Sequence, residues 1–116
     1  MNTKKIEILQ VRIQRIKEKI SGIEEMRPGS LSKQFNVCGN PKCRCKDPDN
    51  PQRHGPYFQI SYTRKGKSTT EFVRKEMVAD VKKELKNYQE FKKLMDKWID
   101  LSIDIGKLRR RVYKNK

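Results

Sequence analysis

All three cysteines and the only histidine of this 116-residue chain lie within one stretch, residues 38–54. Cys38, Cys43, Cys45 and His54 follow the pattern C-x4-C-x-C-x8-H. Three thiolates and one imidazole form a donor set that suits tetrahedral zinc. The residues between them are glycine, asparagine, proline and charged residues, which have little apolar surface to bury, so a bound metal would supply folding free energy. The pattern predicts a structural Zn²⁺ site with these four ligands.

Other interpretations of the same stretch stay open, because two cysteines separated by one residue approach a single ion less easily than a C-x2-C pair. The cysteines would then be free thiols or a redox pair, with Cys43 or Cys45 carrying any thiol chemistry. Asp47 or Asp49 would replace His54 as the fourth ligand, since both lie in the same loop. We expect no enzyme activity, because acid–base catalysis needs titratable groups that converge in a pocket, and the carboxylates are scattered.

The elements that must position this loop begin with two helices. Apolar residues recur at alternating spacings of three and four from Ile6 to Ile23, which is a heptad pattern and predicts a helix over 1–27 that ends before Pro28. The same spacing in the last part of the chain predicts one long helix over 75–114. The two apolar seams would pair as a coiled-coil hairpin within one chain or as a dimer with a second copy.

Between the helices the apolar period changes to two, which indicates strands. Residues 57–63 and 68–73 alternate on either side of the glycine-containing turn 64–67, and residues 30–37 alternate upstream. We therefore expect a three-stranded antiparallel sheet over 28–74, with the cysteine loop inserted between its first two strands.

The expected fold is α+β in a single domain of 116 residues, with a helix covering one face of the sheet. Alternation predicts that Phe58, Ile60, Tyr62 and Phe72 face that helix. The open face would then carry Ser30, Ser32, Gln34, Asn36, Tyr57, Gln59, Ser61, Thr63 and Thr69, with Glu71 as an acidic exception.

The chain is strongly basic, with a formal charge of +15 from 29 lysines and arginines against 14 acidic residues. Such a field attracts polyanions, of which nucleic acid is the commonest in a cell. We predict a zinc-stabilised protein whose sheet face reads double-stranded DNA in preference to RNA. Expected base contacts are Gln34, Gln59, Ser61 and Thr69, and expected phosphate contacts are Arg44, Arg53, Arg64, Lys65 and Lys67.

Two alternative functions lack catalysis as well. The heptad seams would suit a coiled-coil oligomerising adaptor, and the same basic sheet would suit an RNA-binding protein. The polar outer face of the sheet is also what any solvated antiparallel sheet shows. No run of eighteen apolar residues and no apolar N-terminal stretch occurs, so we expect a cytoplasmic protein, nucleoid-associated if it binds DNA.

The sequence resembles an uncharacterised family of small bacterial and archaeal proteins that are loosely described as transposase-like or mobile-element-associated. The motifs that carry the resemblance are Pro28-Gly29-Ser30-Leu31-Ser32, Cys38-Gly39, Cys43-Arg44-Cys45, His54-Gly55-Pro56-Tyr57, Ile60-Ser61-Tyr62, Gly66-Lys67 and Asn87-Tyr88. A weaker likeness, at the level of the fold, is to the arm-type DNA-binding domain of tyrosine recombinases. It rests on Gly29-Ser30-Leu31, residues 57–63, Gly66-Lys67 and residues 72–85, and it implies DNA reading by the sheet without strand-transfer chemistry.

Overall fold

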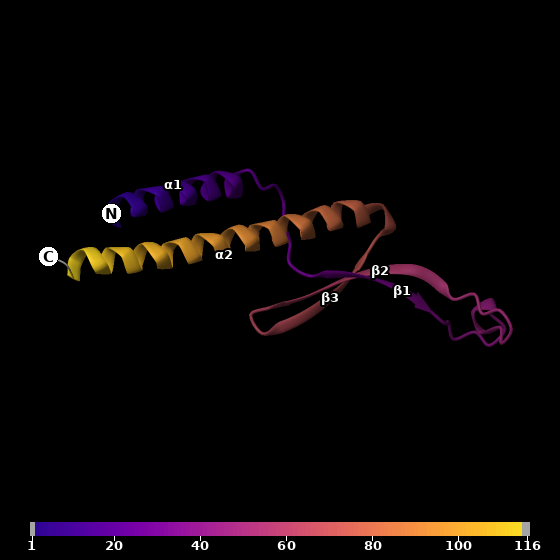
Figure 1. The fold of residues 1–116 in the computed structure, drawn as a ribbon. Coiled ribbons are helices and arrows are strands. Elements are labelled where there is room, and N and C mark those ends of the chain that lie inside the picture. Colours follow the sequence, from indigo (N-terminus) through magenta and orange to yellow (C-terminus); the bar gives the residue numbers. More distant parts are fainter. Residues whose placement is uncertain (1, 115–116) are drawn as a thin grey trace. The chain divides into compact units, whose positions relative to one another are not determined.

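The computed structural model describes residues 2–114 and contains two helices and one three-stranded antiparallel sheet (Figure 1). This confirms the expected α+β class. The chain forms two compact units, a helical unit of Met1–Met26 with Lys86–Lys116 and a sheet unit of Arg27–Leu85. In order, the elements are α1 (Asn2–Ser21), β1 (Ser30–Asn36), η1 (Arg44–Lys46), β2 (His54–Arg64), β3 (Lys67–Val73), η2 (Lys75–Met77) and α2 (Val78–Lys114).

The first helix ends six residues earlier than the sequence pattern predicted, at Ser21 instead of residue 27. The reason is Gly22, whose weak helix propensity allows the chain to leave the helix there. The Gly22 N–H donates to the carbonyls of Glu18 and Lys19 at 3.3 and 3.2 Å, which satisfies groups that a helix end leaves unpaired. Residue 1 of the predicted helix lies outside the described residues.

Within the helical unit, α1 packs antiparallel on α2, so that the start of α1 and the end of α2 lie at the same end of the pair (Figure 1). Its buried core consists of Ile13, Ile16, Leu94, Leu101 and Ile105. These residues belong to the two predicted seams, so the seams bury each other within one chain. Among residues 2–114, no helix is both long enough and apolar enough to span a membrane.

The sheet unit has strand order β1-β2-β3, with Ile60 on the central strand only 1% exposed. Ile60, Val73 and Val81 form its buried core, in which the first turn of α2 covers the sheet. Residues paired across an antiparallel sheet share a face, and the register pairs Phe58 with Val73 and Gln59 with Phe72.

The predicted face of Phe72 is therefore wrong. Phe72 lies on the open face with 65% of its surface exposed, and Val73 takes its place in the core. The physical reason is the tight turn, in which Lys65 and Gly66 both have positive φ and Arg64 pairs with Lys67. This pairing fixes every later position of β3, and a slip of one residue exchanges the faces.

The start of the sheet is tied to α2 by Arg27. Its N–H donates to the Glu84 carbonyl at 3.3 Å, and its side-chain Nε lies 2.7 Å from the Glu84 carboxylate. Gly29 follows with φ 128°, and a Cβ there would lie 2.8 Å from the Ser61 carbonyl oxygen. Only glycine allows β1 to approach β2 this closely at that point.

Candidate metal centre

Cys38, Cys43, Cys45 and His54 come together at one end of the sheet. Their ligand atoms all lie within 4.8 Å of one another. The Cys38 and Cys45 sulfurs are 3.5 Å apart, and the Cys43 sulfur lies 3.1 Å from Nε2 of His54. Cys45 is 2% exposed, and the other three are half-buried. The four predicted metal ligands therefore form one compact cluster.

The size of this cluster fits a tetrahedral ion. With metal–sulfur bonds of about 2.3 Å and metal–nitrogen bonds of about 2.0 Å, the edges of a tetrahedron are about 3.8 Å between sulfurs and about 3.5 Å between sulfur and nitrogen. The observed separations of 3.1 to 4.8 Å bracket these values. The four residues are thus close enough to hold one metal ion.

Local hydrogen bonds shape the loop around the cluster. The Asn40 side-chain oxygen accepts from the Lys42 N–H at 3.0 Å, and its carbonyl accepts from the Cys43 N–H at 3.2 Å. Next, the short helix η1 carries Cys45 into the interior, and the Cys38 N–H donates to the Cys45 sulfur at 3.3 Å. Because Cys45 is the one buried side chain of the loop, apolar packing alone offers this segment little stability.

The Asp47 carboxylate, which the sequence offered as an alternative fourth ligand, forms hydrogen bonds with the backbone of the loop instead. Its Oδ1 accepts from the backbone N–H groups of Asp49 and Asn50 at 2.9 and 3.4 Å, as in an Asx turn. The cluster of potential metal ligands contains His54 and neither aspartate.

His54 is placed by an irregularity at the first residues of β2. The register with β1 shifts between Gln34 and Asn36, and Asn36 pairs with His54 beyond the shift. Gly55 has φ 136°, and a Cβ on it would lie 2.8 Å from the Gln34 carbonyl oxygen. Bulges of this kind re-aim a side chain at a strand end, here the imidazole that reaches Cys43.

The hydrogen bonds of the loop favour thiolates at two of the three cysteines. The pKa of Cys38 is lowered to about 6, first by a hydrogen bond with the backbone of Asn40 and then by His54 and Cys43. The pKa of Cys43 is lowered mainly by a hydrogen bond with the backbone of Cys45. Burial raises the pKa of Cys45, and hydrogen bonds with Cys38 and then Cys43 raise the pKa of His54. Hydrogen-bond donors directed at sulfur suit metal-bound thiolates.

The residues predicted to contact nucleic acid are spread over the sheet unit. Arg44 and Arg53 lie in the segment 38–54 that carries the four candidate metal ligands, called the metal loop below. Arg64, Lys65 and Lys67 surround the β2–β3 turn at the opposite end of β2. All five side chains are exposed. The predicted base contacts Gln34, Gln59 and Ser61 lie on the open face of the sheet, as the register with their neighbours requires.

Thr69 does not lie on that face. It pairs with Tyr62 and therefore faces the α2 side, and so does Glu71, whose carboxylate accepts a hydrogen bond from the Tyr62 hydroxyl at 3.0 Å. The register places two further residues on the open face, namely Thr70, which the sequence pattern did not single out, and Phe72, which it assigned to the α2 side. Counting outward from the Lys65-Gly66 turn would have found them.

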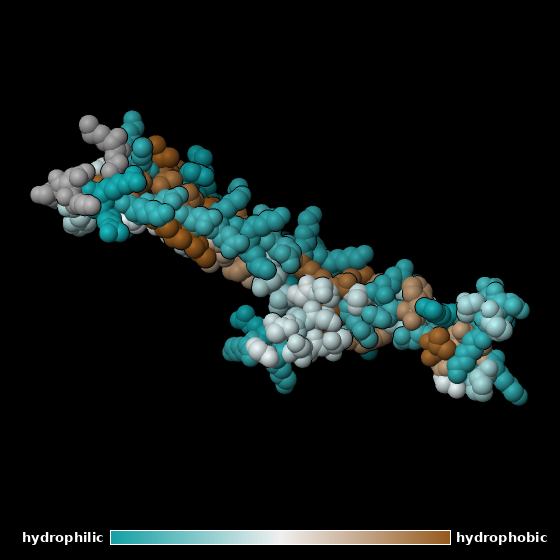
Figure 2. Space-filling view, turned by 60° about the horizontal axis from the view of Figure 1, so that its bottom comes forward, coloured by the Kyte–Doolittle hydropathy of each residue, from teal (hydrophilic) through white to brown (hydrophobic). Residues whose placement is uncertain are grey.

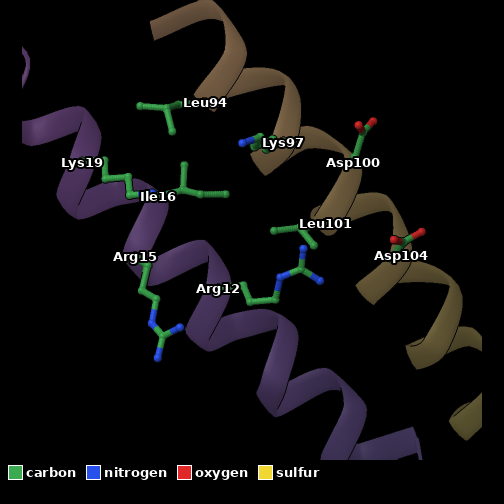
Figure 3. A pocket seen from close by; sticks show the side chains of 9 residues that line it. All are labelled: Arg12, Arg15, Ile16, Lys19, Leu94, Lys97, Asp100, Leu101 and Asp104. Carbon is green, nitrogen blue, oxygen red and sulfur yellow. The ribbon is translucent and has the colours of Figure 1, made fainter. Parts of the chain in front are cut away.

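The helical unit has a charged hollow of about 430 Å³ on one flank of the α1–α2 pair. It is lined by Arg12, Arg15, Ile16, Lys19, Leu94, Lys97, Asp100, Leu101 and Asp104. In Figure 3 the Asp100 and Asp104 carboxylates point away from α1, and Arg15 points away from α2. Groups that diverge in this way surround no common centre, in contrast to the side chains of Cys38, Cys43, Cys45 and His54.

A family model described as "Domain of unknown function (DUF6788)" matches residues 6–83 of the chain. The matched segment contains most of α1, the whole sheet and all four residues of the Cys38–His54 cluster. This agrees with the resemblance to an uncharacterised family, while the description mentions neither transposases nor recombinases. No curated protein and no solved structure matches the chain.

Proposed function

The chain belongs to the family of the domain of unknown function DUF6788, and we propose that it is a zinc-stabilised protein that binds double-stranded DNA with the open face of its sheet. The ion is zinc, because three thiolates with one imidazole are borderline-soft donors in tetrahedral reach of one another. Four protein ligands leave no open coordination position, so the role of the zinc is structural.

One observation carries the DNA proposal, namely a polar face without carboxylates between two basic ends. With Glu71 turned to the α2 side, the three strands present no acidic side chain on the open face. Two pairs of hydroxyl groups lie there, Ser61 with Thr70 at 3.1 Å and Thr63 with Ser68 at 3.0 Å. Each pair uses one donor and one acceptor internally, which leaves further donors and acceptors for base edges.

The dimensions of the sheet suit a duplex. β2 has 11 residues, which extend about 33 Å, and one turn of B-DNA extends about 34 Å. The metal loop with Arg44 and Arg53 is at one end of this strand, and the cationic turn with Lys65 is at the other. A two-stranded ribbon such as β2–β3 fits the major groove, which is about 12 Å wide. Cations at both ends would then lie near phosphates.

A second candidate is single-stranded nucleic acid. It is favoured by Tyr57 and Phe72, whose rings lie 6.4 Å apart on the open face at an interplanar angle of 51°. Exposed aromatic rings stack on unpaired bases, a contact that duplex DNA does not allow.

The test is fluorescence anisotropy with a labelled duplex of about 20 base pairs and with single-stranded DNA and RNA of equal length. If five cations neutralise phosphates on the duplex, log K should fall against log salt with a slope of about −4.5. Preference for single strands would select the second candidate. Absence of binding at about 50 mM salt, or a slope near zero, would refute both.

A matched pair of variants locates the surface. Lys65→Gln with Lys67→Gln should reduce the magnitude of the slope by about 1.8, because two phosphate contacts are lost. Lys82→Gln with Lys83→Gln is the control, since both lysines are exposed on α2 and not on a strand. It removes the same charge and should leave the slope almost unchanged. Elemental analysis of the same preparations should give one zinc per chain.

A further inference from the structure

We propose that α2 carries a self-association face, made of Met95, Ile99, Ser102, Ile103 and Gly106, that binds the same face of a second copy in antiparallel orientation. The face lies beside the seam that α1 covers, so it is available while the hairpin is intact. The proposal is independent of the metal centre and of nucleic-acid binding.

The first observation is the exposure of apolar side chains at helical spacing. Ile99 and Ile103 keep 50% and 51% of their surfaces exposed. With Met95, Trp98 and Ser102 they line a shallow hollow of about 350 Å³. Figure 2 shows hydrophobic side chains reaching the surface of the helical unit. Apolar residues that recur every three to four positions mark one side of a helix, and this side has no partner among residues 2–114.

The second observation is that the face is complementary to itself in size. In an antiparallel pair of α2 helices related by a two-fold axis at the level of residue 101, Ile99 of one copy faces Ile103 of the other, and Met95 faces Gly106. A Cβ on Gly106 would meet nothing within 4 Å, so the space over this glycine is open. The long Met95 side chain of one copy therefore lies over Gly106 of the other, which has no side chain. Because of the two-fold symmetry, each of these contacts occurs two times in the dimer.

The third observation is that the same register is complementary in charge. Asp96 and Lys107 border the face and are both exposed. They are 11 residues apart on one helix, about 16 Å, and neither has an ion-pair partner among residues 2–114. The antiparallel register brings Asp96 of each copy opposite Lys107 of the other. At the outer ends of the face, Lys92 of one copy lies opposite Arg110 of the other. These like charges repel, so the helix–helix contact ends between them. Agreement of size and charge about one axis selects a second copy as the occupant.

The test is sedimentation velocity of the full chain from about 5 to 500 µM. We expect the mass to rise from the 13.8 kDa of one chain towards twice that value. Ile99→Glu with Ile103→Glu should weaken association at least about tenfold, because it buries charge without a partner. The control is Ile8→Glu with Val11→Glu, two positions on α1 that are each 53% exposed. A wild type that stays monomeric, or a control that dissociates equally, would overturn the proposal.

Two further variants remain informative if the glutamates disturb the fold. Gly106→Leu should hold or raise the thermal stability, since glycine weakens a helix interior, yet weaken the dimer at least about tenfold by occupying the place of Met95. Asp96→Lys should weaken the dimer, and Asp96→Lys with Lys107→Asp should restore it. Unchanged association of Gly106→Leu, or a charge exchange that restores nothing, would refute this register.

Discussion

Removal of the metal should lower the stability of the sheet unit substantially and leave that of the helical unit unchanged. The ion would connect Cys38, just beyond β1, to His54, the first residue of β2, and so close a segment of 17 residues, 38–54. Without the ion, the ordered loop retains one buried side chain, Cys45, and a few turn hydrogen bonds. The sheet itself rests on a core of only three buried residues.

The magnitude follows from the length of the closed loop. The chain-entropy relation for a cross-link that closes 17 residues gives about 3 kcal/mol at 25 °C. A unit the size of Arg27–Leu85 has a typical total stability of about 3 to 9 kcal/mol. Loss of the cross-link therefore removes a large part of the unit's free energy of unfolding. It corresponds to a fall in Tm of about 12 to 24 °C for a unit of this size.

The assay is thermal unfolding followed by circular dichroism, with and without a strong chelator, together with hydrogen exchange resolved by segment. We expect the chelator to lower the Tm of the sheet unit by the stated amount and to expose the amides of β1 and β2. Amides of α1 should keep their protection. Cys38→Ser should reproduce the effect without chelator, and Asn50→Ser, an exposed substitution in the same loop, should not.

Two results would refute this reasoning. One is an unchanged Tm in preparations that elemental analysis shows to be free of metal. The other is a Cys38→Ser variant that binds one equivalent of zinc as tightly as the wild type, since the sulfur would then not be a ligand.

Three further predictions test the register, the face and the donor set. Val73→Ala should lower the free energy of unfolding in urea by about 2 kcal/mol because Val73 is 6% exposed, whereas Phe72→Ala should change it by less than about 0.5 kcal/mol; equal losses would contradict the register. Gln59→Ala should weaken duplex binding several-fold in the anisotropy assay, and Thr69→Ala should not, because Thr69 faces α2. A larger loss of affinity for Thr69→Ala than for Gln59→Ala would place the DNA on the other face of the sheet. Zinc affinity, measured against a chromophoric chelator, should fall from pH 7 to 5, most steeply below about 6 where the Cys38 thiolate regains its proton; a flat profile would exclude thiolate ligands.

Much of the fold was predictable because periodicity reports which surfaces must be buried. The apolar seams within residues 1–27 and 75–114 predicted two helices, and their mutual packing follows from apolar stripes of similar length. The metal cluster was predictable for a different reason. Thiol and imidazole side chains are scarce in this chain, and their concentration in one polar loop has few physical explanations.

The errors arose where one local residue decides a whole segment. Gly22 ends α1 although apolar spacing continues to Ile23, because periodicity does not register the cost of glycine in a helix. In β3, Phe72 and Val73 are both apolar neighbours, so alternation alone cannot select the inward one. The Lys65-Gly66 turn makes that choice through its two-residue length.

The strand order β1-β2-β3 makes β2 the one strand of this sheet that is paired along both sides. If β1 separates when its anchor at the metal loop is lost, a row of main-chain amides and carbonyls becomes bare beside Tyr57, Phe58 and Ile60. β2 carries Ile60, the most buried residue of the sheet core, and an exposed strand edge beside apolar side chains can add further strands from other chains. Preparations treated with a chelator should therefore form β-rich aggregates. Metal in the purification buffers should keep the protein in solution.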